Sequence, residues 1–384
     1  MILPVSDKAV LRLIQSRRAS SQVQIARQLG VSANTIHSII RRLLDQQAIE
    51  RSNTERRQIG RPTLHYRMKI PAPSLAVQWM GTEWHLGLIY PDEALDTAIH
   101  WEMAVTPDAK TALKVLAQNA VELLKTHKLS IKKVAGCAFS LNAARVKKTG
   151  QLTSSVIPWA AEIRESDIEE ALGCRAWLLT APGSAETELS ERAPVGCRRL
   201  SVFNVGDGVS GHGCGYTPNW SDTEILHGEI GHIIAEPGGK ACGCGHRGCL
   251  ETVLSGPALQ QRVREDIKSG IQTKLSRVLE DPPKAFFNAL EAWAVSGRDD
   301  YASSIADEFL DRCAWAVSII ANIYNPDVIV LSGYGLDGRT RWMSRIRELA
   351  LPKVLHGEQL TLEFPRCAPS ENLRRLAEAA FLNQ

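Results

Sequence analysis

The chain has 384 residues, of which 44% are hydrophobic, so it is long enough for two or three packed domains. It contains no run of 18 apolar residues, and its first residues lack the pattern of a secretory signal. These features argue against a membrane span and a secretory signal. Nine Cys, three of them within residues 242–249, are typical of a reduced cytoplasmic protein with a metal cluster rather than of a disulfide framework. The net charge is +3, but residues 1–69 hold 13 Lys and Arg against 4 Asp and Glu, whereas the remainder holds 32 against 38. A basic head on a mildly acidic body is typical of a nucleic-acid-binding domain joined to a second domain.

The first 50 residues predict a helix-turn-helix. Apolar residues recur at helical spacing over 7–16, 21–29 and 32–47, Ser32 stands at a cap position, and Gly30 interrupts the pattern as a tight turn requires. This arrangement directs the N-terminal part of the third helix toward the major groove of DNA. The residues expected in the core are Val10, Leu11, Leu13 and Ile14 in the first helix, Val23, Ile25, Ala26 and Leu29 in the second, and Ile36, Ile39, Ile40, Leu43 and Leu44 in the third.

The outward face of the third helix is expected to contact DNA. Asn can form a bidentate hydrogen bond with adenine, and Arg can neutralise a phosphate. Double-stranded operator DNA is therefore the predicted partner. The predicted DNA-contacting residues of this helix are Ser32, Asn34, Thr35, His37, Ser38, Arg41 and Arg42.

Residues 48–68 predict two short strands around a basic turn, which is the layout of a wing. Arg56, Arg57 and Arg61 cluster at its tip, and the sequence Gly60-Arg61-Pro62 favours an extended Arg that fits a narrow minor groove. A solvated surface charge is the alternative for any one of these Arg. Beside a helix-turn-helix, the cluster as a whole favours DNA contact.

The composition changes at the Pro-rich segment 70–74, which we interpret as a linker. It separates a winged helix-turn-helix domain over 1–69 from a body over 75–384. Strands and helices alternate along the body, so we expect an α/β fold in two lobes. Strands are expected over 75–80, 84–90, 134–141, 175–180, 199–206 and 327–331, and helices over 109–127, 162–172, 256–268, 301–324 and 371–382. The helix over 109–127 is expected to bury Leu113, Leu116, Val121 and Leu124.

The segment 227–256 combines one imidazole, from His232, with the thiols of Cys242, Cys244 and Cys249. Structural zinc is usually held in a tetrahedron by such ligands, and the interspersed glycines let the backbone turn tightly enough for the thiols to converge. A set of buried free thiols is the alternative, but so many glycines would make a poor packed core. The segment predicts a structural zinc site. The nearby residues His212 and Cys214 are weaker candidates.

Three motifs resemble the ROK family, whose name stands for repressor, open reading frame, kinase. They are the Glu-Ile-Gly-His sequence at 229–232, the Cys-rich run at 242–251 and the strand at 326–333. The resemblance implies an actin-like sugar-kinase fold, with a first lobe over about 75–180 plus the C-terminal helix and a second over about 181–360. It also implies that the four residues named above hold zinc and that the protein forms dimers or tetramers. The head resembles that of ROK repressors of sugar operons.

The resemblance also implies a sugar site. In sugar-binding members the residues at the positions of Glu229, His232 and Glu251 touch sugar hydroxyls. Carboxylates suit this role because they accept hydrogen bonds from vicinal hydroxyls, while a metal would fix the imidazole. A purely structural shell around the zinc is the competing interpretation.

The sequence departs from the kinase members at three places. Trp79 stands near the position where kinase members have the Asp that handles nucleotide and metal, and Thr180 stands at the position of their general-base Asp. Asp207 lies in the segment that corresponds to a phosphate-binding loop, where its carboxylate would repel phosphate. A Thr hydroxyl is not basic near neutral pH, and such a base normally contributes about 10²–10⁴-fold in rate. We therefore predict no enzyme activity and no catalytic residues. Asn142 and Trp159 could replace lost sugar contacts, although each taken alone is better explained as structural.

The leading hypothesis is a DNA-binding transcriptional regulator, a repressor of carbohydrate-related genes, whose body forms a homo-oligomer and binds a sugar or sugar-derivative effector. An oligomer presents two heads to the two half-sites of a palindromic operator. One alternative is a regulator whose body is a ligand-free scaffold for oligomerisation or protein docking. An active sugar kinase is the other alternative, and Trp79 and Thr180 argue against it.

Overall fold

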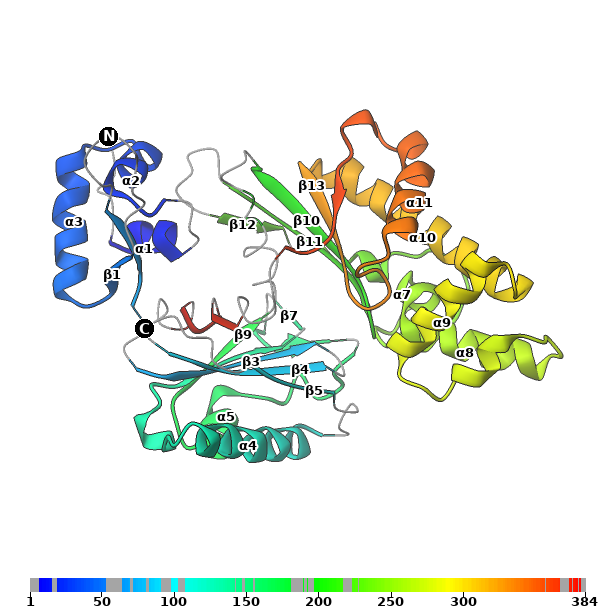
Figure 1. Cartoon of the computed structure of the whole chain (residues 1–384), viewed down its shortest axis with the longest axis horizontal. Helices are drawn as coiled ribbons and strands as arrows, with labels where there is room; N and C mark the ends of the chain where they lie inside the picture. The colour runs from blue at the N-terminus through cyan, green and yellow to red at the C-terminus, as the bar shows by residue number, and fades with distance from the viewer. Residues whose placement is uncertain are drawn as a thin grey trace. The chain divides into compact units, whose positions relative to one another are not determined.

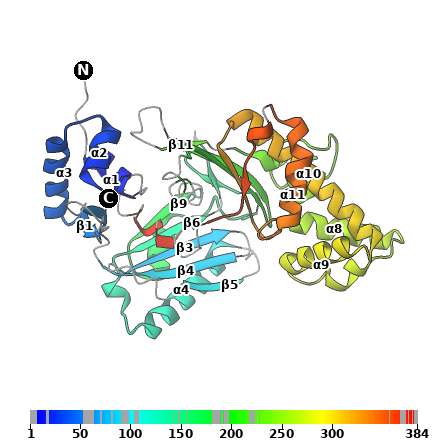
Figure 2. The ribbon, with the colours of Figure 1, turned by 45° about the horizontal axis from the view of Figure 1, so that its top comes forward.

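The computed structural model describes residues 7–15, 19–52, 64–69, 72–80, 83–90, 98–102, 108–141, 143–146, 149–154, 156–180, 189, 192, 197–216, 223–226, 228–355, 357–366, 373–374, 376–378 and 380. The chain divides into two compact units (Figures 1 and 2). The first comprises Met1–Gly196, Tyr216–Glu224 and Cys367–Gln384, and the second comprises Cys197–Gly215 and Ile225–Arg366. No helix among the described residues is long and apolar enough to cross a membrane.

The described part of the head contains three helices and a two-stranded sheet, which confirms the predicted helix-turn-helix with a wing. Gly30, in the left-handed conformation with φ 64°, ends the second helix, and the Ser32 side chain accepts a hydrogen bond from the backbone N–H of Thr35 to begin the third. The strands are antiparallel, with Ile49 opposite Met68. The elements are α1 (Asp7–Gln15), α2 (Gln22–Leu29), α3 (Ala33–Asp45), β1 (Ile49–Ser52) and β2 (His65–Met68).

The core of the head follows the expected pattern except on α2. Val23, which was expected in the core, is 71% exposed. The buried residues Ile25 and Ala26 lie on the other side of the helix, and Leu29 continues their stripe one turn later, so Val23 is out of register with the apolar face. The fully or nearly buried residues of the head core are Val10, Leu13, Ile14, Ala19, Ile25, Ala26, Ile36, Ile39, Ile40, Leu43, Ile49, Tyr66 and Met68.

The rest of the first unit is built on a five-stranded mixed sheet, in the strand order β5-β4-β3-β6-β9. Strands β3, β6 and β9 are parallel, whereas β4 is antiparallel to both β3 and β5. The strands are β3 (Ser74–Met80), β4 (Glu83–Ile89), β5 (Ala98–Glu102), β6 (Cys137–Leu141) and β9 (Ala176–Thr180). The other elements are α4 (Ala109–Thr126), η1 (Ile131–Lys133), β7 (Ala144–Arg145), β8 (Leu152–Thr153) and α5 (Glu165–Leu172).

Both faces of this sheet are covered, because side chains alternate along each strand. Leu75 and Val77 face the layer formed by α4 and α5, whereas Ala76 on the same strand packs with residues of the C-terminal segment (Figure 1). Val121 was expected on the buried face of α4 but is 50% exposed. That face runs instead through residues spaced three and four apart, which are Ala112, Leu113, Leu116, Ala120, Leu123 and Leu124.

The second unit contains another five-stranded sheet, in the order β12-β11-β10-β13-β14. The strands are β10 (Arg199–Val205), β11 (Val209–Tyr216), β12 (Thr223–Leu226), β13 (Val328–Ser332) and β14 (Leu362–Glu363). The α-helices are α7 (Glu251–Leu254), α8 (Gly256–Lys268), α9 (Pro283–Ser296), α10 (Asp300–Tyr324) and α11 (Thr340–Ala350). The 3-10 helices are η3 (Ile230–His232), η4 (Lys274–Val278), η5 (Leu351–Lys353) and η6 (Gly357–Gln359). Helix α10, the longest, packs against both α9 and α11.

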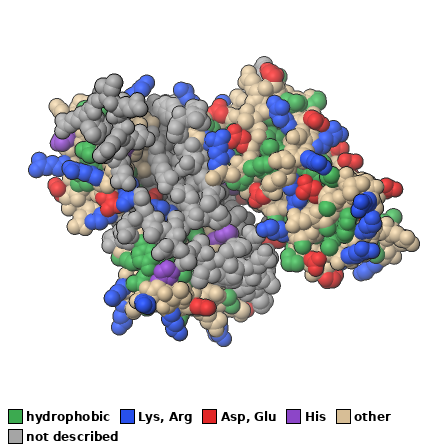
Figure 3. All heavy atoms as spheres, viewed as in Figure 1, with side chains coloured by type: hydrophobic (Ala, Val, Ile, Leu, Met, Phe, Trp, Pro, Cys, Tyr) green, Lys and Arg blue, Asp and Glu red, His purple; other side chains and the backbone are tan. Residues whose placement is uncertain are grey.

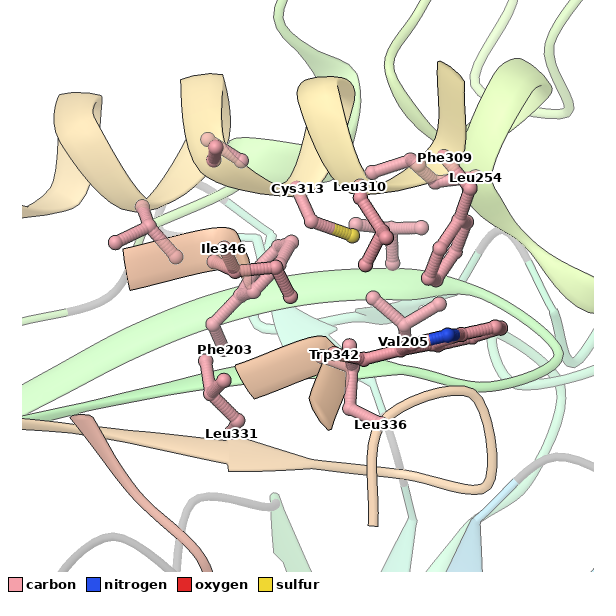
Figure 4. Close-up of a cluster of buried hydrophobic side chains, with 14 of the residues drawn as sticks. Phe203, Val205, Leu254, Phe309, Leu310, Cys313, Leu331, Leu336, Trp342 and Ile346 are labelled. Atoms are coloured by element: carbon pink, nitrogen blue, oxygen red, sulfur yellow. The ribbon is translucent and has the colours of Figure 1, made fainter. Parts of the chain in front are cut away.

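The core of the second unit lies between this sheet and the helices (Figure 4). Phe203 and Leu331 from the strands face Phe309 and Cys313 from α10, and Trp342 from α11 closes the cluster. All five side chains are buried. The large apolar area removed from water fixes the sheet and α10, and this core supports the Cys-rich loop that precedes α7.

Candidate metal loop and nucleic-acid interface

The structure brings the predicted DNA-contacting residues of α3 onto one exposed face. All seven, from Ser32 to Arg42, are exposed to solvent, whereas Ile36, Ile39 and Ile40 on the opposite face are buried. Arg41 and Arg42 are the basic residues of this exposed face, and blue Lys or Arg side chains reach the surface in this part of the head among side chains of other types (Figure 3). A helix with a buried apolar stripe and a polar, basic outer face has the geometry that a recognition helix needs.

Several of these side chains are already engaged within the head. The Ser32 hydroxyl lies 2.9 Å from that of Thr35, and the Ser38 hydroxyl donates to the backbone carbonyl of Asn34 over 3.2 Å. Arg42 donates to the carboxylate of Asp7, an ion pair that lowers the pKa of Asp7.

Arg41 has no ion-pair partner among the described residues. It is therefore more available than Arg42 to contact a DNA phosphate. The predicted wing-tip residues Arg56, Arg57, Gly60 and Arg61 lie outside the described residues.

The Cys-rich loop in the second unit is held by its own backbone. The N–H groups of Ala235 and Glu236 both donate to the carbonyl of Gly248, over 2.8 and 3.0 Å, and the Gly248 N–H donates to the carbonyl of Lys240 over 2.8 Å. Gly248 has φ 75°, and a Cβ there would lie 1.7 Å from the Glu236 carbonyl oxygen. Only glycine fits at this crossing, so the sequence closes the loop tightly.

This loop brings the four predicted metal ligands together. The donor atoms of His232, Cys242, Cys244 and Cys249 all lie within 4.8 Å of one another. The Cys242 sulfur is 3.7 Å from Nδ1 of His232, and the Cys244 and Cys249 sulfurs are 3.6 Å apart. Ligands at zinc bond lengths of about 2.0–2.3 Å in a tetrahedron would be about 3.3–3.8 Å apart. The donor set and its spacing therefore fit a tetrahedral zinc site.

The thiols of the loop differ in acidity. Burial raises the pKa of Cys242 to about 12, and it also raises the pKa of Cys249. Burial opposes ionisation of Cys244 too, but hydrogen bonds from the backbone and ring of His246 lower the pKa of Cys244 to about 6. Because zinc is held by thiolates, a metal ion that binds here would displace protons from the thiols of the loop.

Charged neighbours brace the loop. Arg312 donates to the carboxylate of Glu236 over 2.7 Å and to the carbonyl of Ala235 over 3.2 Å. Lys240 pairs with Glu265 over 2.6 Å. These contacts fix the loop to α10 and α8, so the metal ligands are supported on helices rather than on a free surface loop.

The predicted sugar ligands differ in their surroundings. Glu251 accepts a hydrogen bond from the backbone N–H of Val209 over 3.0 Å and another from the Cys242 thiol over 3.8 Å. Glu229 is exposed, and its carbonyl accepts a bond from the His232 N–H. Asn142 lies outside the described residues. These bonds favour a structural role for Glu251 next to the metal loop.

The weaker metal candidates, His212 and Cys214, lie on β11, and neither belongs to the four-residue cluster.

The positions that differ from the kinase members are filled by packing. Trp79 is 1% exposed, and its ring centroid lies 3.6 Å from that of Trp84 and 4.3 Å from that of Trp159. Trp159 is therefore a core residue in this structure. Thr180 ends β9, where it pairs with Leu141.

Asp207, at the position that the ROK resemblance aligns with a phosphate loop, contacts Tyr334, a residue that the sequence analysis did not predict at this site. Asp207 accepts a hydrogen bond from the Tyr334 hydroxyl over 2.8 Å. The Tyr334 ring also lies next to Gly206 and Gly256. No spacing rule could have paired residues 127 positions apart.

Comparisons with known proteins agree with this architecture. A model of the ROK family matches residues 191–372, and a model of winged helix-turn-helix DNA-binding domains matches residues 5–50. A solved ROK family transcriptional regulator, a homologue of the Escherichia coli MLC protein, superposes with a TM-score of 0.69 over 98% of this chain and 96% of its own, at 19% identity. A ROK glucokinase from Streptomyces griseus, solved with glucose, superposes with a TM-score of 0.60 over 80% of this chain and 99% of its own, at 17% identity.

Curated relatives match shorter stretches. The glucokinase of Thermotoga maritima is 34% identical over 129 residues, which are 34% of this chain and 39% of the relative. The DNA-binding transcriptional dual regulator NagC of Escherichia coli is 36% identical over 106 residues, 28% of this chain and 25% of the relative. The chain thus spans well under two thirds of the length of these relatives. Residues 191–372 thus match the ROK family, residues 5–50 match winged helix-turn-helix DNA-binding domains, and nearly the whole chain shares its fold with a solved ROK transcriptional regulator.

Proposed function

We propose that the protein is a transcriptional regulator that binds operator DNA through its head and that its body has no kinase activity. The observation that carries the proposal is the exposed polar and basic face of α3, on a head whose apolar helix faces pack into one core. The N-terminal residues of such a helix reach base edges in the major groove, and Arg side chains neutralise phosphates. The likeness to the NagC regulator and to the MLC homologue supports this role.

The glucokinase relatives favour a second candidate, a sugar kinase. Trp79 argues against it because a buried indole, stacked on Trp84 and packed against Trp159, offers no oxygen for a metal or a proton. The Asp207 carboxylate, held by Tyr334, places negative charge where a kinase would hold phosphate. Both features support a body that has the sugar-kinase fold but does not catalyse phosphate transfer.

The body is proposed to contain one structural zinc, held by His232, Cys242, Cys244 and Cys249. Closely spaced donors, one acidic thiol and a loop braced by Arg312 support this assignment. Zinc bound by four protein ligands has no open position for substrate, so its contribution is to fold stability.

We further propose that the body forms a homo-oligomer and binds a sugar or sugar derivative. Glu229 supports an effector site because its side chain is exposed beside the metal loop. The hydrogen bonds of Glu251 favour the alternative, a body that is a ligand-free scaffold. The proposal that the regulated genes are carbohydrate-related rests on the resemblance to ROK repressors.

Fluorescence anisotropy with the full chain tests the proposal. A duplex that the protein selects from a randomised pool should bind far more tightly than a scrambled duplex of equal length and charge. Asn34→Ala should lose discrimination at one base pair, which costs roughly 1–3 kcal/mol if Asn34 makes a bidentate contact. Failure to bind any duplex at low salt would contradict the proposed function.

Gln118→Ala, at an exposed position on α4 in the body, is the matched control for Asn34→Ala. It removes the same kind of polar side chain and should leave the discrimination unchanged. Equal losses from both substitutions would mean that α3 does not read bases.

A further inference from the structure

A single glutamine joins three elements of the head. Gln22 is the first residue of α2, and its side-chain Nε2 lies 3.2 Å from Nδ1 of His37 on α3. The same nitrogen donates to the hydroxyl of Tyr66 on β2 over 3.4 Å. The amide thus connects the outer face of α3 to the helix before it and to the sheet.

His37 lies at a groove of about 1210 Å³ that runs beside α3 and the β1–β2 sheet. Gln22, His37, Arg41 and Tyr66 all line this groove. His37 is exposed and lies three residues after Asn34, so the two side chains share one face of α3. A ring in this place can reach a base edge while its inner nitrogen is held by Gln22.

The orientation of the Gln22 amide selects which ring nitrogen of His37 carries the proton. In the structure the amide nitrogen faces both partners, and because this nitrogen has two hydrogens and no lone pair for accepting, Nδ1 of His37 and the hydroxyl oxygen of Tyr66 accept from Gln22 in this orientation. A neutral imidazole that accepts at Nδ1 carries its hydrogen on Nε2. The outer edge of His37 is then a hydrogen-bond donor.

A donor in the major groove selects among bases. Guanine presents acceptors at N7 and O6, adenine at N7 and thymine at O4, whereas cytosine presents only its amino donor. An N–H group therefore finds a partner on three bases and none on cytosine.

We propose that Gln22 is a positioning residue that fixes the tautomer and orientation of His37, so that His37 donates one hydrogen bond to a base in the major groove and disfavours cytosine at that position. This inference rests on the proposed DNA-binding function. Gln22 itself need not touch the base, because it acts through the imidazole.

The test is a double-mutant cycle on the full chain, measured by fluorescence anisotropy. The probes are the duplex that the wild-type protein selects from a randomised pool and variants of it with cytosine at each half-site position. Gln22→Met keeps a side chain of similar length but removes both donors. Gln46→Met, at the exposed C-terminal cap of α3, is the matched control.

His37→Ala should lose about two- to tenfold discrimination against cytosine at one position, the value of one hydrogen bond. Gln22→Met should lose a similar factor at the same position, and the double variant should lose no more than His37→Ala alone. Gln46→Met should lose nothing. Because a merely structural Gln22 would weaken binding equally with and without His37, this non-additivity separates positioning from stability.

Additive losses, or full discrimination in Gln22→Met, would overturn the inference. A wild-type preference for cytosine at the His37-dependent position would also overturn it, because the proton would then be on Nδ1. Should Gln22→Met fail to fold, Gln22→Leu in the same cycle gives the same comparison. Absence of binding to every duplex would refute the proposed function itself, whereas specific binding with an additive cycle would refute only the role of Gln22.

Discussion

Replacing Gly248 by Ala should disrupt the metal loop far more than replacing the neighbouring Gly245. Both glycines have positive φ, 75° and 93°, so an Ala at either position costs about 1–2 kcal/mol of backbone strain. An added Cβ at Gly245 meets no atom within 4 Å, but at Gly248 it would lie 1.7 Å from the Glu236 carbonyl oxygen. The loop must open there to relieve the overlap.

Opening the loop breaks the backbone hydrogen bonds that Gly248 makes with Ala235, Glu236 and Lys240. At about 0.5–1.5 kcal/mol for each bond, the loss together with the strain comes to about 3–6 kcal/mol. Loop closure and metal binding are coupled, so zinc affinity should fall about 10²–10⁴-fold in Gly248→Ala. The strain alone predicts about 5–30-fold in Gly245→Ala.

Competition with a chromogenic chelator measures the zinc affinity of the full chain, and a thermal unfolding curve reports whether the second unit remains folded. The expected order of affinity is wild type, then Gly245→Ala, then Gly248→Ala by a wide margin. Equal affinities for the two variants, or a Gly248→Ala protein that holds zinc as tightly as the wild type, would refute the assignment of the loop as the metal site.

Three further outcomes are expected. Incubation with ATP, magnesium and common hexoses should yield no sugar phosphate above background in a coupled assay, and turnover that disappears in Glu251→Gln would contradict the inactive body. Arg41→Ala should reduce the slope of log affinity against log salt by up to about one unit, whereas Arg42→Ala should change it less because Asp7 already pairs with Arg42; equal changes would contradict this. The lowered pKa of Asp7 means that its pair with Arg42 stabilises the folded head at pH values above 3.8, the ordinary pKa, and that this contribution is lost as the pH falls through the lower folded value. Urea unfolding of Asp7→Asn should therefore show a weaker loss of stability below pH 4 than the wild type, and parallel curves would contradict the role of this pair.

The head could be predicted from sequence because its signals are local. Ser32 at the start of α3 and Gly30 at the end of α2 determine the turn through contacts within a few residues. The periodicity of α3 placed its outer face correctly, and only Val23 on α2 was assigned to the wrong side. A short helix gives too few turns for the apolar stripe to be located reliably when Val stands next to it.

The metal loop was also predictable, since three Cys and several Gly are close in sequence. Its partner His232 lies only ten residues before Cys242. The spacing did not show that Gly248 is the crossing point or that Arg312 from α10 braces the loop, because both depend on tertiary contacts.

Elements of the second unit were harder to predict. Helix α9 begins at Pro283, directly after Pro282, and a pair of prolines reads as a loop although Pro is well suited to the first turn of a helix. The contact between Asp207 and Tyr334 in the second unit joins residues far apart in the chain, and so does the contact between Asp7 and Arg42 in the head. No local pattern carries such information, so these contacts required the fold.

Sequencing of the DNA that co-purifies with the full chain after cross-linking in its native cells tests the central claim most directly. The account predicts enrichment of inverted repeats whose half-site centres are separated by whole turns of about 10–10.5 base pairs. It also predicts that Asn34→Ala combined with Arg41→Ala abolishes this enrichment while the protein remains folded. DNA that shows no enriched sequence with the wild-type chain, or the same enrichment with the double variant, would contradict the claim that α3 recognises an operator.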